Sequence, residues 1–419
     1  MLGLVAFAIP GMGIATEDPS LADLAELQSL YRQRDFFALR DRLQSISAPE
    51  KSSVETGLLK AAVQQAFNDP EGSNQTISSL LATGETEAGQ VLRLRNLQLT
   101  NHLRLHRYGA ALESARAILS SPAADTAPEI VTDVQGKLPL LEALEDVPPQ
   151  EIDFLGPSLL ALGQTKRVPL TIEGSKFQFA LDTGANFSVI MRSEAQKLGL
   201  EIRPADLVIS TSTAKKVLGD VTVAETVEIG KIRYRNVVFL VLPDELLTFP
   251  GGHRIPGLVG FPVVEAMGEV RFRRDNVMEI PRDPPRRALQ NLALNDLEPL
   301  TQVRYRKDNL LCRLDTGASL TVFYEPFFQK YRQRIESAGH PITAKAGGVG
   351  GFQEIPAYRL QELVLTVARS GVTLRRVEVY TEPIRKPEEN YLYCNVGLDV
   401  LGQLQAYIIN FQDMALVLN

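Results

Sequence analysis

The sequence Leu181-Asp-Thr-Gly-Ala185 recurs 133 residues later as Leu314-Asp-Thr-Gly-Ala318. Each copy ends a run of alternating apolar residues, and each is followed by a second apolar segment that ends in Val189-Ile190 or Val322-Phe323. One short motif supports no function by itself, but two copies with matching flanks indicate an internal repeat. A repeated Asp is also what an active site with two carboxylates needs.

Each Asp-Thr-Gly loop can carry a carboxylate to a fixed place at the end of a strand. Gly184 and Gly317 let the backbone turn sharply, so that an N–H group can approach a carboxylate oxygen. If two such loops meet, one of Asp182 and Asp315 keeps a proton, because like charges that close cannot both be ionised. The pair can then activate a water molecule and polarise a carbonyl, which is general acid–base hydrolysis. The alternative is that each Asp only caps its own turn.

Both repeats resemble retropepsin-like aspartic proteases, whose strand-borne motif is Asp-Thr-Gly-Ala. The second signature of that family, two apolar residues and a Gly, occurs as Leu258-Val259-Gly260 and, with a polar first residue, as Asn395-Val396-Gly397. The resemblance covers roughly residues 165–280 and 297–419. It implies an extended polypeptide substrate, bound as a strand along a cleft.

The resemblance also assigns roles residue by residue. It implies that Asp182 and Asp315 are the catalytic dyad. It implies supporting roles for the residues that follow each Asp, with the threonines exchanging hydrogen bonds between the loops and the glycines holding the carboxylates coplanar: Thr183, Gly184, Thr316 and Gly317.

Family members close a β-hairpin, called a flap, over the substrate. In the second repeat the candidate is Ala346–Phe352, in which Gly348 and Gly350 suit a mobile lid. In the first repeat it is the more polar segment Ser210–Gly219, with Thr213 near its centre. Phe352 either covers the cleft or packs on its own hairpin, and the sequence leaves both open.

The two cysteines stand at matching places in the second repeat. Cys312 lies three residues before Asp315, and Cys394 lies three residues before Gly397. The resemblance places the two strands side by side, so a disulfide is open if the protein is exported. We expect free buried thiols instead, because neighbouring strands seldom offer the geometry for a bridge.

Hydrophobic periodicity divides the chain into parts. Apolar residues recur at steps of three and four over residues 20–148, which predicts a helical domain. One segment, Tyr108–Leu119, resembles a helix of a tetratricopeptide-type hairpin, and an ordinary helical bundle is the alternative. Period-two runs of β-branched residues then predict a first protease lobe over 149–283 and a second over 297–419, with an exposed Pro/Arg-rich linker at 284–296.

Composition excludes several classes of function. The 44% hydrophobic and 22% charged residues are typical of a soluble globular protein. A formal net charge of −6 favours neither nucleic acid nor an anionic membrane as a partner. Four histidines and two cysteines are too few and too scattered for a zinc site. We therefore expect no metal and no organic cofactor.

Residues 1–19 form an apolar segment that is too short to span a bilayer as a helix. Gly13 and Ala15 suit the −3 and −1 positions of a signal-peptidase site, although no positive charge precedes Arg32. We expect a secretory signal and a periplasmic or secreted protein. The alternative is that these residues form a buried N-terminal segment. No later segment of the sequence is predicted to span a membrane stably.

Together these patterns predict a multidomain chain: an N-terminal α-helical domain followed by two all-β, acid-protease-type lobes related by pseudo-twofold symmetry. The expected function is that of a single-chain aspartic endopeptidase. The alternative is a non-catalytic peptide-binding module with a helical protein-interaction domain. In either case the helical domain is a candidate site for a protein partner.

Overall fold

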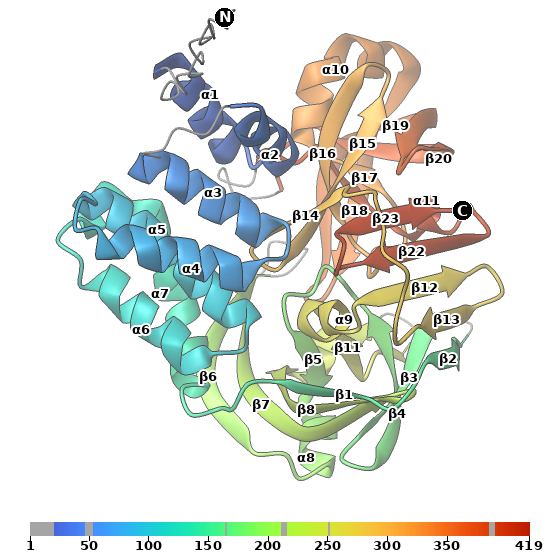
Figure 1. Cartoon of the computed structure of the whole chain (residues 1–419). Coiled ribbons are helices and arrows are strands. Elements are labelled where there is room, and N and C mark those ends of the chain that lie inside the picture. Colours follow the sequence, from blue (N-terminus) through green and yellow to red (C-terminus); the bar gives the residue numbers. More distant parts are fainter. Residues whose placement is uncertain (1–20, 47–52, 164–165, 211–215, 250–251, 385–389) are drawn as a thin grey trace, which may run out of the picture.

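The computed structural model describes residues 21–46, 53–163, 166–210, 216–249, 252–384 and 390–419 of the 419-residue chain. Helices come first in the chain and two β lobes follow (Figure 1). The predicted signal segment 1–19 and the flap candidate Thr213 lie outside the described residues, so both remain predictions. None of the described helices is long and apolar enough to cross a membrane.

Seven α-helices form the described N-terminal part, and consecutive helices pack against each other. Side-chain caps define where several of them begin: Asp35, Ser53 and Asp69 each accept a hydrogen bond from a backbone N–H of the first turn. The helices are α1 (Leu21–Arg32), α2 (Phe36–Ser45), α3 (Val54–Ala66), α4 (Pro70–Ala82), α5 (Ala88–Arg104), α6 (Tyr108–Leu119) and α7 (Pro128–Ala143), with a short 3₁₀ turn, η1 (Ala124–Thr126), before α7. The tetratricopeptide-type resemblance remains a prediction.

The first β lobe is built on an eight-stranded sheet of order β1-β8-β5-β11-β4-β3-β7-β6, which a β7–β8 pairing closes on itself. Its strands are β1 (Glu151–Phe154), β3 (Arg167–Ile172), β4 (Ser175–Leu181), β5 (Ser188–Met191), β6 (Ile202–Ser210), β7 (Lys216–Ile229), β8 (Ile232–Leu242) and β11 (Gly257–Val259). Smaller elements complete it: α8 (Arg192–Lys197), η2 (Asp244–Leu247), β9 (Thr248–Phe249), β10 (His253–Arg254) and α9 (Phe261–Ala266).

The second β lobe is built on a sheet of order β14-β15-β16-β21-β17-β20-β19-β18, which a β15–β19 pairing closes. Its strands are β14 (Leu292–Asn295), β15 (Glu298–Tyr305), β16 (Asp308–Leu314), β17 (Val322–Phe323), β18 (Gly339–Gly348), β19 (Gly351–Val367), β20 (Ser370–Tyr380) and β21 (Cys394–Val396). Two helices, α10 (Glu325–Ala338) and α11 (Leu398–Leu401), accompany them.

The two closed sheets share one pairing cycle. In the first lobe it runs β3-β4-β11-β5-β8-β7 and back to β3; in the second it runs β15-β16-β21-β17-β20-β19 and back to β15. Each cycle places the strand that ends in Asp-Thr-Gly beside the strand that ends in the later Gly signature. The repeat in the sequence is thus a repeat of topology, and a pseudo-twofold relation between the lobes remains a prediction.

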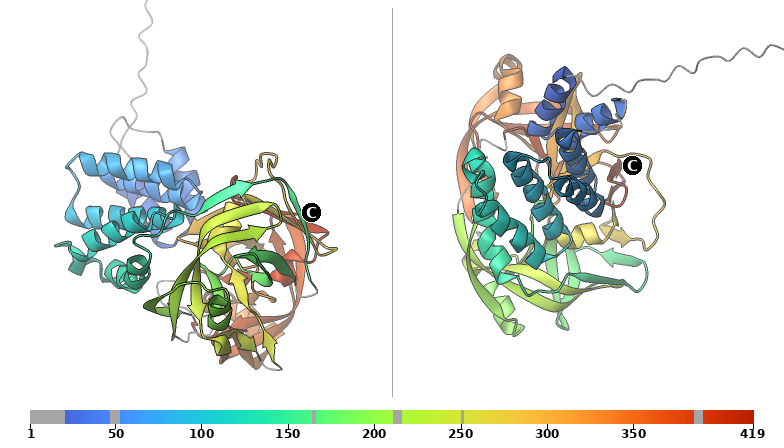
Figure 2. Two further views of the ribbon diagram at one scale, coloured as in Figure 1. Left: turned by 90° about the horizontal axis from the view of Figure 1, so that it is seen from below. Right: turned by 60° about the vertical axis from the view of Figure 1, so that its left-hand side comes forward.

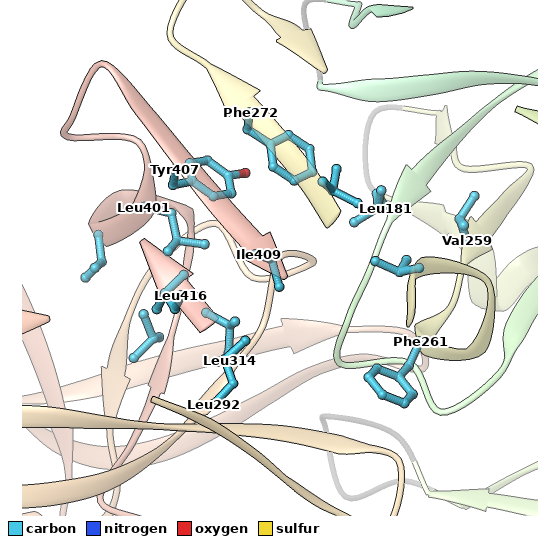
Figure 3. Packing of buried hydrophobic residues seen from close by; sticks show 14 of the residues in the cluster. Leu181, Val259, Phe261, Phe272, Leu292, Leu314, Leu401, Tyr407, Ile409 and Leu416 are labelled. Atoms are coloured by element: carbon cyan, nitrogen blue, oxygen red, sulfur yellow. The ribbon is translucent and has the colours of Figure 1, made fainter. Parts of the chain in front are cut away.

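A third sheet of five strands joins the lobes, in the order β2-β13-β12-β22-β23. Strands from the first lobe pair directly with strands from the end of the chain: β2 (Ser158–Ala161), β12 (Glu269–Arg273), β13 (Val277–Ile280), β22 (Ala406–Asn410) and β23 (Ala415–Leu418). One hydrophobic core runs through both lobes across this sheet (Figure 3). Burying each large apolar side chain there stabilises the fold by about 1.5–3 kcal/mol.

The predicted linker at 284–296 differs from the structure at both ends. Strand β14 lies inside that range and pairs with β15, so Leu292–Asn295 belong to the second lobe. Arg287 is not a free surface residue, because its guanidinium binds the fully buried carboxylate of Glu269 at 2.9 Å. A buried carboxylate needs such a partner, and a pattern of Pro and Arg along the sequence could not show where that partner lies.

The helices cover both lobes (Figure 2). Side chains from α1–α5 share a hydrophobic cluster with strands of the second lobe. Side chains from α5–α7 share another with Leu207, Val221 and Val238 of the first lobe. Arg104 of α5 also pairs with Glu265 of α9 at 2.7 Å, and both side chains are largely buried. The helical part is therefore packed on the two β lobes rather than tethered to them by a flexible linker.

Candidate active site

Strands β4 and β16 deliver the two Asp-Thr-Gly loops. Immediately after β4, the N–H of Asp182 donates to the carbonyl of Val259 at 2.9 Å, and after β16 the N–H of Asp315 donates to Val396 at 3.0 Å. Each Asp is therefore anchored to the strand that carries the later Gly signature. The local sequence positions both carboxylates in the same way.

Two threonines lock the loops to each other. The N–H of Thr183 donates to Oγ1 of Thr316 at 3.0 Å, and the N–H of Thr316 donates to Oγ1 of Thr183 at 3.1 Å. Each hydroxyl in turn donates to a carbonyl of the other lobe, Leu314 at 2.9 Å and Leu181 at 3.1 Å. All four groups are buried, so these reciprocal bonds fix the loops face to face.

The carboxyl groups meet across this contact. A Cβ atom added to Gly184 would lie 2.8 Å from Cγ of Asp315, and one added to Gly317 would collide with the carboxyl of Asp182. Only glycine leaves room for the opposite carboxyl group. The structure thus brings together Asp182, Thr183 and Gly184 with their three counterparts in the second loop. Their catalytic roles remain predictions.

Burial raises the pKa of Asp182 to about 7, and the negative charge of Asp315 and a hydrogen bond between the two carboxyls act in the same direction. The Arg313 guanidinium and the N–H of Gly184 oppose this rise of the pKa. A proton is therefore held between the two groups at mildly acidic pH. Such a pair can both accept and donate a proton, as general acid–base chemistry requires.

The two carboxylates have unequal partners. Oδ1 of Asp182 accepts from the N–H of Gly184 at 2.8 Å. Oδ1 of Asp315 accepts from the N–H groups of Gly317 at 2.9 Å and Ala318 at 3.0 Å, and its Oδ2 accepts from the side-chain amide of Asn395 at 3.0 Å. The environment of Asp315 therefore offers more donors to a negative charge.

Arg313 is a second asymmetric feature. Its Nη2 donates across the lobe boundary to the carbonyl of Gly184, and its Nε lies 3.1 Å from Oε1 of Glu298. The equivalent position in the first lobe is Ala180, which cannot make such a contact. One side chain of the second lobe thus binds the Asp-Thr-Gly loop of the first.

The second-lobe flap candidate forms a hairpin tip. Strands β18 and β19 pair from Gly339 to the Gly348–Gly351 pair, with positive φ at Gly350 and Gly351. Val349 at the tip belongs to a hydrophobic cluster of the first lobe that also contains Ala185, the residue after the first Asp-Thr-Gly. The hairpin therefore extends over the lobe boundary beside the paired loops.

Phe352 follows this tip. Its ring lies against Gly347, its cross-strand partner, and its side chain is 51% exposed. The ring thus packs on its own hairpin and also presents a surface to solvent. In the first lobe the matching hairpin is β6–β7, whose turn around Thr213 lies outside the described residues. The roles of all the flap candidates remain predictions.

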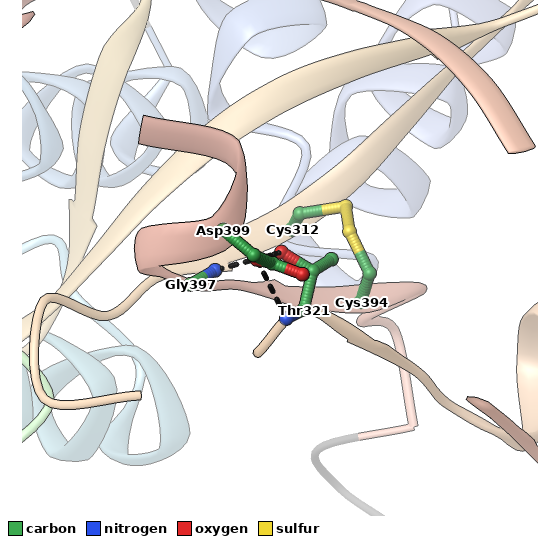
Figure 4. Close-up of a disulfide and its surroundings, with 5 residues drawn as sticks. All are labelled: Cys312, Thr321, Cys394, Gly397 and Asp399. Atoms are coloured by element: carbon green, nitrogen blue, oxygen red, sulfur yellow. Dashed lines mark hydrogen bonds between the residues drawn. A yellow bond between two sulfur atoms is a disulfide. The ribbon is translucent and has the colours of Figure 1, made fainter. Parts of the chain in front are cut away.

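The expectation of free thiols is wrong. Cys312 and Cys394 form a disulfide, with Cα atoms 4.8 Å apart (Figure 4). They lie directly opposite each other on the parallel strands β16 and β21. That Cα separation lies within the usual range for a disulfide, so this neighbouring pair does offer bridging geometry. Spacing along the sequence could not reveal the register.

Beyond the disulfide, the second lobe is tied together by Thr321 (Figure 4). Its hydroxyl accepts from the N–H of Gly397 at 2.9 Å and donates to Oδ1 of Asp399 at 2.6 Å. In the first lobe, Ser188 accepts from the N–H of Gly260 at 3.0 Å in the matching way. These bonds hold each Gly signature against the segment that follows its own Asp-Thr-Gly loop.

The sequence interpretation missed Arg313 and Asn395 as site residues. Two signals were present: a charged residue inside an apolar strand, and a polar first residue in the second Gly signature. Neither signal identifies a partner, because the groups that these side chains contact are far away in the sequence.

Comparison with known proteins gives one family match. Residues 168–263 match the model of the aspartyl protease family. The chain is also similar to a solved retropepsin-like aspartic protease from Rickettsia conorii, with 22% identity over 31% of this chain and 92% of that chain and a TM-score of 0.21. No curated protein matches the chain.

The family match covers the first Asp-Thr-Gly loop, the hairpin β6–β7 and the signature at Leu258–Gly260, and it ends before the second loop begins. The first β lobe is thus similar in sequence to an aspartyl protease domain.

Proposed function

We propose that this chain is a single-chain aspartic endopeptidase that hydrolyses peptide bonds with a water molecule activated by Asp182 and Asp315. The observation that carries the proposal is the reciprocal threonine contact, which joins two Asp-Thr-Gly loops so that their carboxyls share a proton. The family match of residues 168–263 supports the same class of chemistry. An extended polypeptide would bind along the loops, beneath the hairpin tip at Gly348–Gly351.

The proposed step conserves atoms and charge. The ionised carboxylate takes a proton from water while the water oxygen bonds to the peptide carbonyl carbon. The protonated carboxyl gives its proton to the carbonyl oxygen, and a diol results. The carboxyl that took the proton of water then gives it to the amide nitrogen as the C–N bond breaks, and the other carboxylate takes a hydroxyl proton of the diol. An amine and an acid leave, and the pair again holds one proton. Since the pKa of Asp182 is about 7, activity should fall as the pH rises through neutrality, when the shared proton is lost.

The test is cleavage of an unfolded protein, reduced and alkylated casein, by the full chain between pH 4 and pH 8. Asp182→Asn should lower the rate by about 10²–10⁴-fold, because it removes a general acid–base group. The matched control is Asp153→Asn, which removes a surface carboxylate that pairs with Arg235 on the outside of the first lobe. Its rate should equal that of the unmodified chain.

Binding of the same casein without cleavage by the unmodified chain would instead support the non-catalytic alternative. A protein partner of the helical domain remains a further proposal. Since that domain shares hydrophobic clusters with both lobes, partner capture is best tested with the full chain and with variants of exposed helix residues.

We also propose that the protein works in the periplasm or outside the cell. The disulfide between Cys312 and Cys394 supports this location, because such bonds persist in oxidising compartments. Fractionation of bacteria that express the full chain, with thiol labelling of each fraction, tests it. A cytoplasmic protein with two reactive thiols after denaturation would contradict the proposal.

A further inference from the structure

The two carboxylates have unequal hydrogen-bond partners, which suggests that one of them is ionised and the other keeps the shared proton. Asp315 receives hydrogen bonds from two backbone N–H groups and from the amide of Asn395. Among the described contacts of Asp182, one backbone N–H, that of Gly184, donates to its carboxylate. Donors to a carboxylate stabilise its ionised form, so the second loop is the better host for the negative charge.

Asn395 has no chemical equivalent in the first lobe. The matching residue of the first Gly signature is Leu258, whose side chain cannot donate a hydrogen bond. Asn395 is only 7% exposed, and within the described structure its Oδ1 has no hydrogen-bond partner. Burying an unpaired amide oxygen costs stability, so this residue is not explained by packing. Its one described side-chain contact is with Oδ2 of Asp315.

The position of Asn395 is fixed from both sides. It follows Cys394, whose disulfide to Cys312 ties β21 to β16, and it pairs in register with Arg313 of β16 on one side and with Val322 of β17 on the other. The amide is therefore held beside the carboxylate that β16 delivers. A side chain fixed in this way loses little entropy when it holds an anion.

Other charged groups near the two aspartates do not reverse the preference of the negative charge for Asp315. Arg313 of β16 reaches the loop of Asp182 through the carbonyl of Gly184, and Glu298 of β15 lies against the same guanidinium. Asp399 of α11 is engaged by the backbone N–H and the hydroxyl of Thr321. Arg313 thus limits the cost of charge on Asp182, while direct donors to the carboxylate oxygens favour Asp315.

We propose that Asn395 is a positioning residue that makes Asp315 the ionised, water-activating carboxylate and leaves the shared proton on Asp182. Its consequence for catalysis rests on the proposed endopeptidase function. Asp315 then takes the proton from water, and Asp182 donates to the carbonyl oxygen of the substrate. The division of charge itself does not depend on any substrate.

The test measures the carboxyl groups directly in the full chain, by ¹³C NMR titration of protein labelled at the aspartate carboxyl carbon. In Asp182→Asn only Asp315 of the pair titrates, and in Asp315→Asn only Asp182 does. We expect Asp315 to titrate at the lower pH. Adding Asn395→Leu to Asp182→Asn should raise the midpoint of Asp315 by about one pH unit, the effect of losing one hydrogen bond to a charged group.

The reciprocal variant is Leu258→Asn, combined with Asp315→Asn. It offers a donor to Asp182 and should lower its midpoint, which keeps the test decisive if Asn395→Leu fails to fold. Equal midpoints for the two aspartates, the reverse order, or no response to either exchange would overturn the proposal. Casein cleavage by the same proteins is a separate readout: intact titrations without hydrolysis would reject the enzyme function and leave the charge assignment standing.

Discussion

The two lobes fill the same structural position with different chemistry. Behind the second Asp-Thr-Gly loop, Cys312 and Cys394 bridge the neighbouring strands β16 and β21. At the matching place in the first lobe stand Phe179 and Gly257, and the ring of Phe179 fills the space that a Cβ on Gly257 would need. The second lobe thus joins its strand pair with a disulfide, and the first lobe packs an aromatic ring against a glycine at the matching strand pair. At these two positions the repeat preserves the strand pairing and not the residue types.

The lobes also differ in what they contribute across their boundary. The threonine contacts are reciprocal, so each lobe gives the same bonds that it receives. The contact of Arg313 with the carbonyl of Gly184 has no counterpart from the first lobe, and within the second lobe Asn395 adds a donor to Asp315. A fused chain can differ in this way, because its halves are free to diverge in sequence. The second lobe therefore contributes its half of the threonine contacts and also the additional donors that stabilise negative charge on Asp315.

Removing the disulfide should have the largest effect on stability. A Cys312→Ala, Cys394→Ala double variant should lose about 4 kcal/mol of unfolding free energy, since the bridge closes a loop with a sequence separation of 82. Urea denaturation of the variant and of the unmodified chain measures the difference. A loss below about 1 kcal/mol would mean that packing alone holds β16 to β21, as it does in the first lobe.

Replacing either threonine should have the next largest effect on stability, and the loss should be equal for the two lobes. Thr183→Val and Thr316→Val each leave a buried N–H and a buried carbonyl unpaired, which should cost about 2–3 kcal/mol. Thermal and urea unfolding measure the loss, and Thr183→Ser, which retains the hydroxyl, is the control. Clearly unequal losses of stability would show that the two threonines contribute unequally, although their hydrogen bonds have the same geometry.

Gly257→Ala tests whether the packing of the Phe179 ring on Gly257 stabilises the first lobe as the disulfide stabilises the second. The added methyl group collides with Phe179 and with the backbone carbonyl of Val189, and overpacking of this kind costs about 1–3 kcal/mol. Gly174→Ser, at an open turn between β3 and β4, tests a glycine with nothing near its Cβ and should show only the strain of its positive φ. A neutral Gly257→Ala would mean that the ring can move aside.

The last expected effect is a pH dependence of stability that is specific to the first lobe. The pKa of Asp182 is about 7 in the folded chain and about 3.9 when unfolded, so between these values the folded state binds more protons. This contribution is therefore favourable in acid and declines as the pH rises from about 4 through about 7. Asp182→Asn should remove up to about 3 kcal/mol of that decline between pH 4 and pH 7, because each unit of pKa difference corresponds to about 1.4 kcal/mol.

Urea unfolding of both proteins at pH 4, 5.5 and 7 measures this slope. Asp153→Asn again serves as the control, because its carboxylate lies on the exposed surface of the first lobe. An Asp182→Asn variant that loses stability with pH as steeply as the unmodified chain would show that the raised pKa does not belong to this residue.

Much of the fold followed from local patterns. The alternating residues before Asp182 and Asp315 predicted strands, and β4 and β16 end immediately before those residues. The boundary between the helices and the strands was visible near Pro148 and Pro149, and β1 begins at Glu151. The linker was predicted less well, because four residues of β14 are too few to show a period.

Local sequence was enough to predict that two strands each end in a loop with a carboxylate, a hydroxyl and a glycine, because a strand period and a tight turn depend only on neighbouring residues. The folded arrangement was needed to show that Cys312 meets Cys394, that Arg313 reaches Gly184 and that Asn395 donates to Asp315. Hydrogen bonds and disulfides require atoms within a few ångströms of each other, and for residues far apart in the chain that proximity is set by packing and register.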